Sequence, residues 1–285
     1  MACSICKQDG HNKSSCKDAV KAVKAVKDAK APKENKKDVK AVSDKPVKVT
    51  TEKAEKAEKT QTIKKEPSMA YLIEQVTNYI AKNTSKEIIL LRNKEVIQWL
   101  FGDLSFLTEL APECKTKKNM EDECKKLEDK WGQNILKTLK RPDLKLDKQW
   151  TNKFGEHLGE ELYTLIGKTV TKPQLKENKQ PDLETEDFIV EVKAQTYFTS
   201  GTAGEKILGV PFKYAEIPDL YGKPLKIVCM GGAEKVCREQ YGNLAGPKCS
   251  PQKKKLLDFF KSMGIEYVAA TDILIGASSS TTETN

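Results

Sequence analysis

The sequence predicts an α/β fold in which helices and strands alternate, with a helical region and a small cysteine-containing module before it. Three patterns support this prediction. Apolar residues recur with helical spacing at 154–166, and runs of strand-forming residues follow at 188–198 and 225–230. The 285 residues are enough for one large domain or two small ones with a substantial core.

The positive charge is concentrated in the first quarter of the chain. Residues 17–68 contain 16 Lys against 9 Asp and Glu, which accounts for +7 of the formal net charge of +9. Long-range attraction to a polyanion is therefore expected from this segment. The sequence has no run of 18 apolar residues and no secretory signal, so we expect a soluble, cytoplasmic protein with no membrane partner.

The first 16 residues contain a metal-binding pattern. Cys3, Cys6, His11 and Cys16 are separated by two, four and four residues, and Gly10 directly precedes the histidine. Three thiolates and one imidazole are donors that tetrahedral Zn²⁺ prefers. The pattern resembles the CCHC zinc knuckle, which implies a structural Zn²⁺ and contact with single-stranded nucleic acid. Two alternatives stay open: a knuckle that binds protein, and cysteines that are spaced this way by chance.

Residues 17–68 form a low-complexity segment of Lys, Ala, Val, Glu and Asp without an aromatic residue. Such a segment cannot bury enough apolar area to offset the entropy of ordering it, so we expect a disordered Lys-rich linker. It could act as a solubilising spacer or as an aid to sliding along DNA.

Residues 69–150 are expected to form a helical subdomain packed on the rest of the chain. Apolar spacing predicts a helix at 70–80, and the apolar residues at 88–101 predict further helix. Residues 115–130 are highly charged and predict a solvated helix or loop, followed by a short amphipathic piece at 135–139. The role of this region, whether target reading or dimerisation, is not visible in the sequence.

Residues 151–277 contain the predicted core and the candidate site. A helix at 154–166 closes at Gly167, and a polar stretch ends in Pro181-Asp182 before the strand at 188–198. Alternation along that strand gives one polar face and one apolar face, with Glu191, Lys193 and Gln195 opposite Val190, Val192 and Ala194. Three polar groups in a row on a buried strand are costly unless they serve a site; the alternative is that this face lies in solvent.

Pro181-Asp182, an eight-residue spacer and Glu191-x-Lys193 resemble the PD-(D/E)xK nuclease superfamily. The resemblance implies a restriction-endonuclease-like core, with a mixed central sheet flanked by helices. It further implies that Asp182, Glu191 and the carbonyl of Val192 hold Mg²⁺, a cation that prefers oxygen ligands. It also implies that Lys193 orients the attacking water and stabilises developing charge. Gln195 matches the extended Glu-x-Lys-x-Gln variant of the motif.

The superfamily often adds an acidic residue from the preceding helix. Glu156, Glu160 and Glu161 are the candidates, and placement in related nucleases favours Glu156. Helical phase instead puts Glu161 beside the apolar stripe, while Glu160 is expected to face solvent.

A glycine-rich turn at 199–209 leads into a further helix. Thr202 and Glu205 fit a capping box, and Thr202, Lys206 and Lys213 are candidate contacts to DNA phosphates at the helix N-terminus. Residues 201–228 are similar to a stretch of type II restriction endonucleases. A strand at 225–230, a helix at 252–263, a strand at 267–269 and a frayed tail at 278–285 complete the prediction.

These patterns favour a type II restriction endonuclease that hydrolyses double-stranded DNA at a specific sequence with Mg²⁺. Two alternatives remain: a structure-selective or repair nuclease of the same superfamily, resembling junction resolvases, and a non-catalytic nucleic-acid-binding protein. The helical region 69–150 favours the first reading, because minimal resolvases lack so large an addition. A homodimer is compatible with all three.

Overall fold

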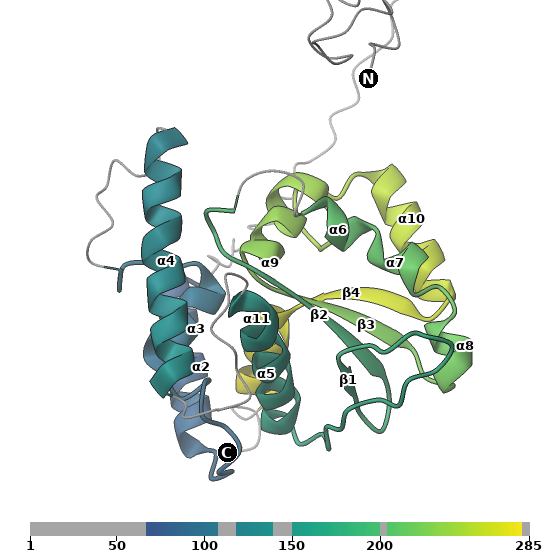
Figure 1. Ribbon diagram of the computed structural model, residues 1–285, viewed down its shortest axis with the longest axis horizontal. Helices are drawn as coiled ribbons and strands as arrows, with labels where there is room; N and C mark the ends of the chain where they lie inside the picture. Colours follow the sequence, from purple (N-terminus) through teal and green to yellow (C-terminus); the bar gives the residue numbers. More distant parts are fainter. Residues whose placement is uncertain (1–66, 108–117, 139–149, 200–203, 281–285) are drawn as a thin grey trace, which may run out of the picture. The chain divides into compact units, whose positions relative to one another are not determined.

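The computed structural model describes residues 67–107, 118–138, 150–199 and 204–280 (Figure 1). All of them belong to one unit of the chain, Ile63–Asn285. The predicted zinc ligands Cys3, Cys6, His11 and Cys16, the Lys-rich linker up to residue 66, and Thr202 lie outside the described residues. Among the described helices, none combines the length and apolar character needed to cross a membrane.

A four-stranded mixed sheet forms the centre of the unit. Strands β1 (Leu183–Glu184), β2 (Ile189–Gln195), β3 (Leu225–Gly231) and β4 (Ile265–Ala269) lie in that order. Strand β1 is antiparallel to β2, whereas β2, β3 and β4 run parallel. The expected mixed sheet with flanking helices is confirmed, and the three longer strands overlap the predicted ranges.

Helices cover both faces of the sheet (Figure 1). One face carries α2 (Met69–Lys82), α3 (Lys94–Phe101), α4 (Lys118–Thr138), α5 (Trp150–Leu165) and α11 (Ala270–Ser280). The other carries the short helices α6 (Glu205–Leu208), α7 (Val210–Lys213), α8 (Ile217–Tyr221) and α9 (Gly232–Val236), the π-helix η3 (Cys237–Tyr241) and α10 (Pro251–Ser262).

Strand β2 sorts its side chains between these faces as the alternation predicts. Val190 and Val192 are buried in the large core cluster shared with α5, and Ala194 packs against it. Two glycines on α5 permit the close approach. A Cβ atom at Gly155 would lie 2.6 Å from Cβ of Ala194, and one at Gly159 would lie 2.9 Å from Cγ2 of Val192. Larger residues at these two positions would push the helix off the strand.

The helical region differs from the sequence expectation at residues 88–93, which form turns and irregular backbone instead of helix. The side chains of Ile88, Leu90 and Leu91 are nevertheless buried, whereas Ile89 is half exposed. The backbone N–H groups of Leu90 and Leu91 donate to the two carboxylate oxygens of Glu161 on α5, each at 2.9 Å. Because a side chain satisfies these amides, the segment can enter the core without helical hydrogen bonds.

Two other expectations about element ends were wrong. Strand β2 ends at Gln195 instead of continuing to 198, since the N–H of Tyr197 donates to Glu128 on α4 and not to a neighbouring strand. Residues 278–280 belong to α11 and are not part of a frayed tail, because the helix starting at Ala270 continues to Ser280.

Glu128 joins the helical region to the end of β2. Its fully buried carboxylate accepts from Nε1 of Trp99 at 2.6 Å and from the N–H of Tyr197 at 2.9 Å. The hydroxyl of Tyr197 in turn donates to the carbonyl of Trp99 at 2.8 Å. Burial raises the pKa of Glu128 to about 7, against the pull of these hydrogen bonds. Of the segment at 115–130 that was expected to be solvated, residues 118–130 belong to helix α4, which buries Cys124 and Glu128.

We predict that Glu128→Ala lowers the free energy of unfolding by about 3 kcal/mol, because it leaves the Trp99 and Tyr197 donors buried without an acceptor. Glu128→Gln should cost much less at pH 8, since one amide oxygen can accept from both donors and no charge is buried. Urea denaturation measures both effects.

Glu123→Ala is the matched control on the same helix, because Glu123 is exposed and pairs only with exposed Lys126 in the interactions described. It should change stability by less than about 0.5 kcal/mol. If Glu128→Ala lowers the free energy of unfolding no more than the control does, Glu128 does not stabilise the contact between α4 and the end of β2.

Candidate active site

The polar face of β2 gathers the side chains that the sequence singles out. Glu191 is buried, while Lys193 and Gln195 are partly buried. Nζ of Lys193 lies 2.5 Å from Oε1 of Glu191 and 3.2 Å from the carbonyl oxygen of Val192. The alternative of a strand face open to solvent therefore fails at Glu191.

Asp182 reaches the same peptide from the antiparallel side. Its backbone N–H donates to the carbonyl of Val190 at 3.1 Å, which begins the pairing between β1 and β2. Its Oδ2 then accepts the N–H of Val192 at 2.7 Å. Asp182, Glu191 and Lys193, which lie nine and two residues apart in the sequence, are thus gathered around the two peptide groups that flank Val192.

The carboxylates of Asp182 and Glu191 are close enough for their negative charges to repel each other. The pKa of Asp182 rises to about 7, mainly because of burial and then because of the neighbouring charge of Glu191. The N–H of Val192 and the ammonium of Lys193 act in the opposite direction, and Glu156 adds a further upward push. A cation bound between these groups would relieve the repulsion.

The donor set fits a hard divalent cation such as Mg²⁺. Oε2 of Glu191 is buried and has no hydrogen-bond partner among the described residues, which is costly for a carboxylate oxygen. The described part of the chain holds no cluster of three or more His, Cys, Asp and Glu side chains suited to a metal. The predicted set instead combines two carboxylates with the main-chain carbonyl of Val192, and all three donors are oxygens.

The three helix glutamates have different surroundings. Glu161 is buried, and its two carboxylate oxygens accept hydrogen bonds from the amides of Leu90 and Leu91, so its role is structural. Glu160 is largely exposed and lies 3.4 Å from Nδ1 of His157. Glu156 pairs with Lys153 at 2.5 Å and contributes to the raised pKa of Asp182. Of the three glutamates, Glu156 is the one whose negative charge raises the pKa of Asp182.

The predicted phosphate contacts divide in a similar way. Lys213 on α7 lies over the ring of Tyr214 at 4.4 Å, and its pKa is raised mainly by Tyr214 and further by Glu191 and Asp182. The negative charges of Glu191 and Asp182 therefore both stabilise the charged form of Lys213. Lys206 is exposed on α6. Helix α6 begins at Glu205, and Gly204 is its N-cap residue. A capping box with Thr202 as the N-cap would make Glu205 the third residue of the helix, so the predicted capping box does not fit the start of α6.

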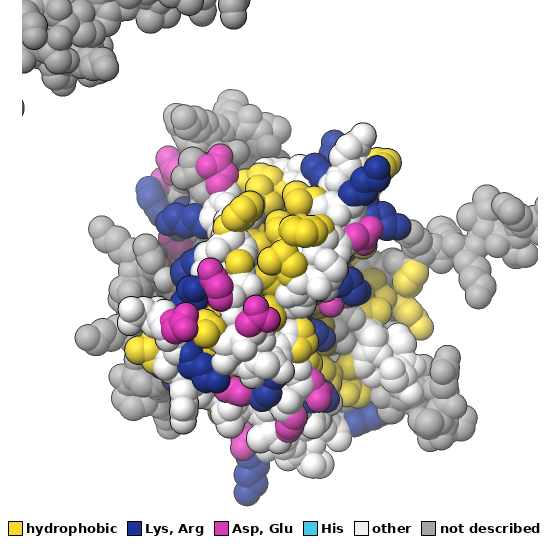
Figure 2. Space-filling view, turned by 90° about the vertical axis from the view of Figure 1, so that its right-hand side faces the viewer, with side chains coloured by type: hydrophobic (Ala, Val, Ile, Leu, Met, Phe, Trp, Pro, Cys, Tyr) yellow, Lys and Arg dark blue, Asp and Glu magenta, His cyan; other side chains and the backbone are white. Residues whose placement is uncertain are grey.

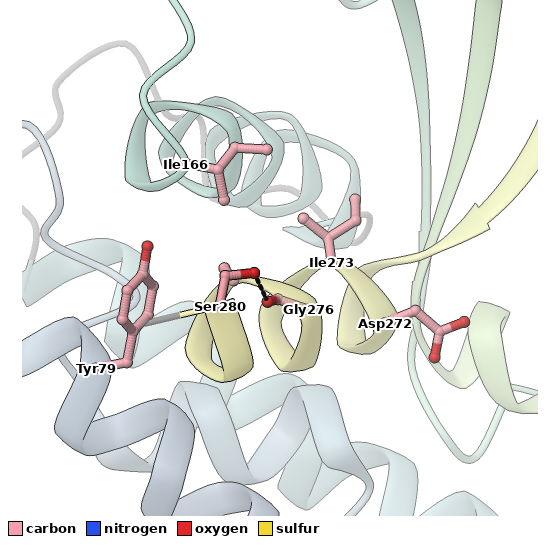
Figure 3. Close-up of a pocket in the computed structure, with 7 residues that line it drawn as sticks. Tyr79, Ile166, Asp272, Ile273, Gly276 and Ser280 are labelled. Atoms are coloured by element: carbon pink, nitrogen blue, oxygen red, sulfur yellow. Dashed lines mark hydrogen bonds between the residues drawn. The ribbon is translucent and has the colours of Figure 1, made fainter. Parts of the chain in front are cut away.

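A surface pocket of about 530 Å³ lies between α2, the end of α5 and α11, and shares no residue with this site (Figure 3). Tyr79, Ile166, Ile273 and Ser280 line it. The carboxylate cluster is therefore identified by its residues and hydrogen bonds, and not by the size of a cavity.

Comparison of the chain with protein-family models, curated proteins and solved structures gave no match. The assignment of the candidate site accordingly depends on the residues and their geometry.

Sequence reasoning did not single out Glu128, although it holds the chain two residues after Gln195. A signal was present: Glu128 lies within the apolar stripe of α4, in phase with Cys124, Trp131 and Ile135, all of which are buried. An acidic residue inside such a stripe indicates a buried partner.

We predict that Asp182→Asn stabilises the metal-free protein at pH 8 by on the order of 1 kcal/mol. The carboxyl of Asp182 has a folded-state pKa of about 7 against 3.8 when unperturbed, so its contribution is present below pH 3.8 and lost as pH rises through 7. Asparagine still accepts the Val192 N–H without carrying charge. The gain should shrink towards pH 4, as measured by urea denaturation with EDTA present.

Asp187→Asn is the control, because Asp187 is exposed and pairs with Lys168 away from the site. It should show no comparable gain at pH 8. A destabilised Asp182→Asn protein at pH 8 would show that Asp182 is a structural anchor instead.

Proposed function

We propose that this protein is a Mg²⁺-dependent endodeoxyribonuclease that cuts double-stranded DNA at a specific sequence, as type II restriction endonucleases do. The observation that carries the proposal is the cluster of Asp182, Glu191 and Lys193 around Val192, in which Oε2 of Glu191 is buried without a partner among the described residues. A structural ion pair would not require that unused oxygen.

Each residue has a role in the proposed reaction. Asp182, Glu191 and the Val192 carbonyl would hold the ion. Bound Mg²⁺ supplies positive charge to the scissile phosphate and lowers the pKa of a water molecule. Lys193, whose ammonium already lies between Glu191 and the Val192 carbonyl, would orient that water and stabilise charge on the phosphate. Gln195, two residues further on the same strand face, would hold the water or a phosphate oxygen.

Nucleic acid is the substrate class that the surrounding charge favours. The ammonium of Lys213 is influenced by both carboxylates, so a phosphate bound there would meet positive charge beside the acidic pair. The +7 excess of residues 17–68 and the knuckle pattern at Cys3, Cys6, His11 and Cys16, with its proposed structural Zn²⁺, add affinity for a polyanion.

We predict that Asp182→Ala and Lys193→Ala each reduce Mg²⁺-dependent cleavage of duplex DNA by about 100-fold to 1,000-fold, with DNA binding retained. Each removes a group that contacts the metal or the reacting atoms in the proposed site. Initial rates on plasmid DNA and fluorescence anisotropy in Ca²⁺ give the two measurements.

Lys179→Ala is a matched control, because Lys179 and Lys193 are each 25% exposed in their side chains and each pairs with a glutamate. It should cleave at nearly the wild-type rate. Wild-type cleavage by Lys193→Ala would refute the site, and equal losses in both lysine variants would indicate a general charge effect.

Digestion of a long mapped duplex with Mg²⁺, followed by sequencing of the ends, tests the class of nuclease. Identical ends at a repeated sequence support a restriction endonuclease. Scattered ends indicate a non-specific nuclease, and cleavage confined to branched DNA indicates a resolvase-like enzyme.

Removing residues 1–66 should weaken duplex DNA binding by about 10-fold at moderate salt and flatten the dependence of affinity on salt. Ser68 must be retained, because its hydroxyl caps α2 by accepting from the N–H of Tyr71. A chain in which the linker lysines are replaced by glutamine separates charge from length. Unchanged affinity across the salt titration would show that the segment has no part in binding.

A further inference from the structure

Two buried cysteines contact each other on the face of the sheet that carries α6 to α10 and η3. Cys229 lies on β3 and Cys237 follows eight residues later at the start of η3, and their sulfur atoms are 3.6 Å apart. A disulfide has roughly 2.05 Å between its sulfur atoms. A small shift of one side chain towards the other is therefore enough to join them.

The two thiols differ in their tendency to lose a proton. Their mutual hydrogen bond lowers the pKa of Cys237 and raises the pKa of Cys229 well above its usual value, and burial adds to the rise at Cys229. The thiolate is the nucleophilic form of cysteine, so Cys237 is the thiol suited to attack an oxidant. Cys229 keeps its proton and is placed to resolve the product.

The backbone around the pair is rigid on one side and deformable on the other. Strand β3 is hydrogen-bonded to β2 and to β4, which fixes Cys229 in the middle of the sheet. Cys237 begins a five-residue π-helix, a rare arrangement that occurs frequently at functional sites. The movement that closes the gap between the sulfur atoms is thus expected in η3 and not in the sheet.

An irregular loop covers the pair. Hydrophobic side chains are exposed on the side of the molecule that carries α10 (Figure 2), but Cys229 and Cys237 are both fully buried. Leu244, in the loop 242–250, packs with both of them. The side-chain nitrogen and oxygen of neighbouring Asn243 are buried without a hydrogen-bond partner among the described residues, which destabilises the closed loop. Local opening of this loop admits a reagent little larger than water.

We propose that Cys229 and Cys237 are a redox modification site, which a peroxide converts into a reversible disulfide. The Cys237 thiolate attacks one oxygen of hydrogen peroxide and the O–O bond breaks, which gives a Cys237 sulfenic acid and a hydroxide ion that takes up a proton to become water. The Cys229 thiol then attacks the Cys237 sulfur. The S–S bond forms, the S–O bond breaks, and the oxygen leaves as water with the thiol proton, so that the peroxide oxidises two thiols and is reduced to water.

The disulfide forms next to the strand that carries the candidate site. Cys229 is the register partner of Lys193 on β2, and the charge of Lys193 acts on the Cys229 thiol. The new bond ties η3 to β3, so the oxidised chain should unfold at a higher urea concentration than the reduced chain. The disulfide does not depend on the proposed function, because neither metal nor DNA takes part in its formation.

Peptide mapping of the folded full chain, with Zn²⁺ retained, tests the disulfide. The chain is treated with a small molar excess of hydrogen peroxide, its remaining thiols are alkylated in denaturant, and trypsin is added. Cleavage after Lys226, Lys235 and Arg238 releases Cys229 in peptide 227–235 and Cys237 in peptide 236–238. Mass spectrometry should find these two peptides linked, with the loss of two hydrogen atoms, in most chains. Dithiothreitol added before alkylation should abolish the link.

Cys249→Ser is the matched control, because Cys249 is a partly exposed free cysteine in the covering loop, and its loss should leave the link intact. Cys229→Ser should stop the reaction at a Cys237 sulfenic acid that dimedone labels, whereas Cys237→Ser should leave Cys229 as a thiol. Two alkylated peptides in the peroxide-treated wild type overturn the proposal and show that both cysteines are inert core residues. A link from either cysteine to Cys249, or only between chains, overturns the pairing.

Discussion

The close packing of α5 on β2 is the contact on which the candidate site depends. Gly155 and Gly159 let the helix backbone approach Val192 and Ala194 closely enough that one face of the strand is sealed in the core. Since side chains alternate along a strand, the opposite face must carry Glu191, Lys193 and Gln195. The polar groups are thus fixed in position by an apolar contact on the other side of the same backbone.

That arrangement puts acidic groups where water cannot fully solvate them. Burial raises the pKa of both Asp182 and Glu128 to about 7, but their surroundings differ. Glu128 has hydrogen-bond donors for both oxygens, as expected of a structural carboxylate. Asp182 lies beside the second carboxylate, Glu191, which has an oxygen without a partner among the described residues. An electrostatically unfavourable pair of this kind is typical of a site that binds a cation.

Local patterns in the sequence were sufficient to predict strands β2, β3 and β4, the helix α5 and the polar face of β2, but not the short strand β1. Periodicity and strand propensity act over a few neighbouring residues. The same patterns predicted helix at 88–93, where the structure has irregular backbone. That outcome depends on Glu161, about 70 residues away, whose carboxylate satisfies the amides of Leu90 and Leu91. Helical phase places Glu161 and Glu128 beside apolar stripes, but it does not show which distant amides they accept from, so the early end of β2 at Gln195 could not be predicted.

The hydrogen bonds around Glu128 also have a consequence for how the protein folds. Glu128 and Tyr197 are 69 positions apart, and the hydroxyl of Tyr197 reaches the carbonyl of Trp99 across 98 positions. Contacts this distant in sequence form late, because the entropy cost of closing a long loop comes before the contacts can stabilise the fold. During synthesis, α3 and α4 emerge well before β2 and leave Trp99 and the Glu128 carboxylate without their final partners. The end of β2 therefore reaches its final geometry only after the strand has emerged and docked against the earlier helices.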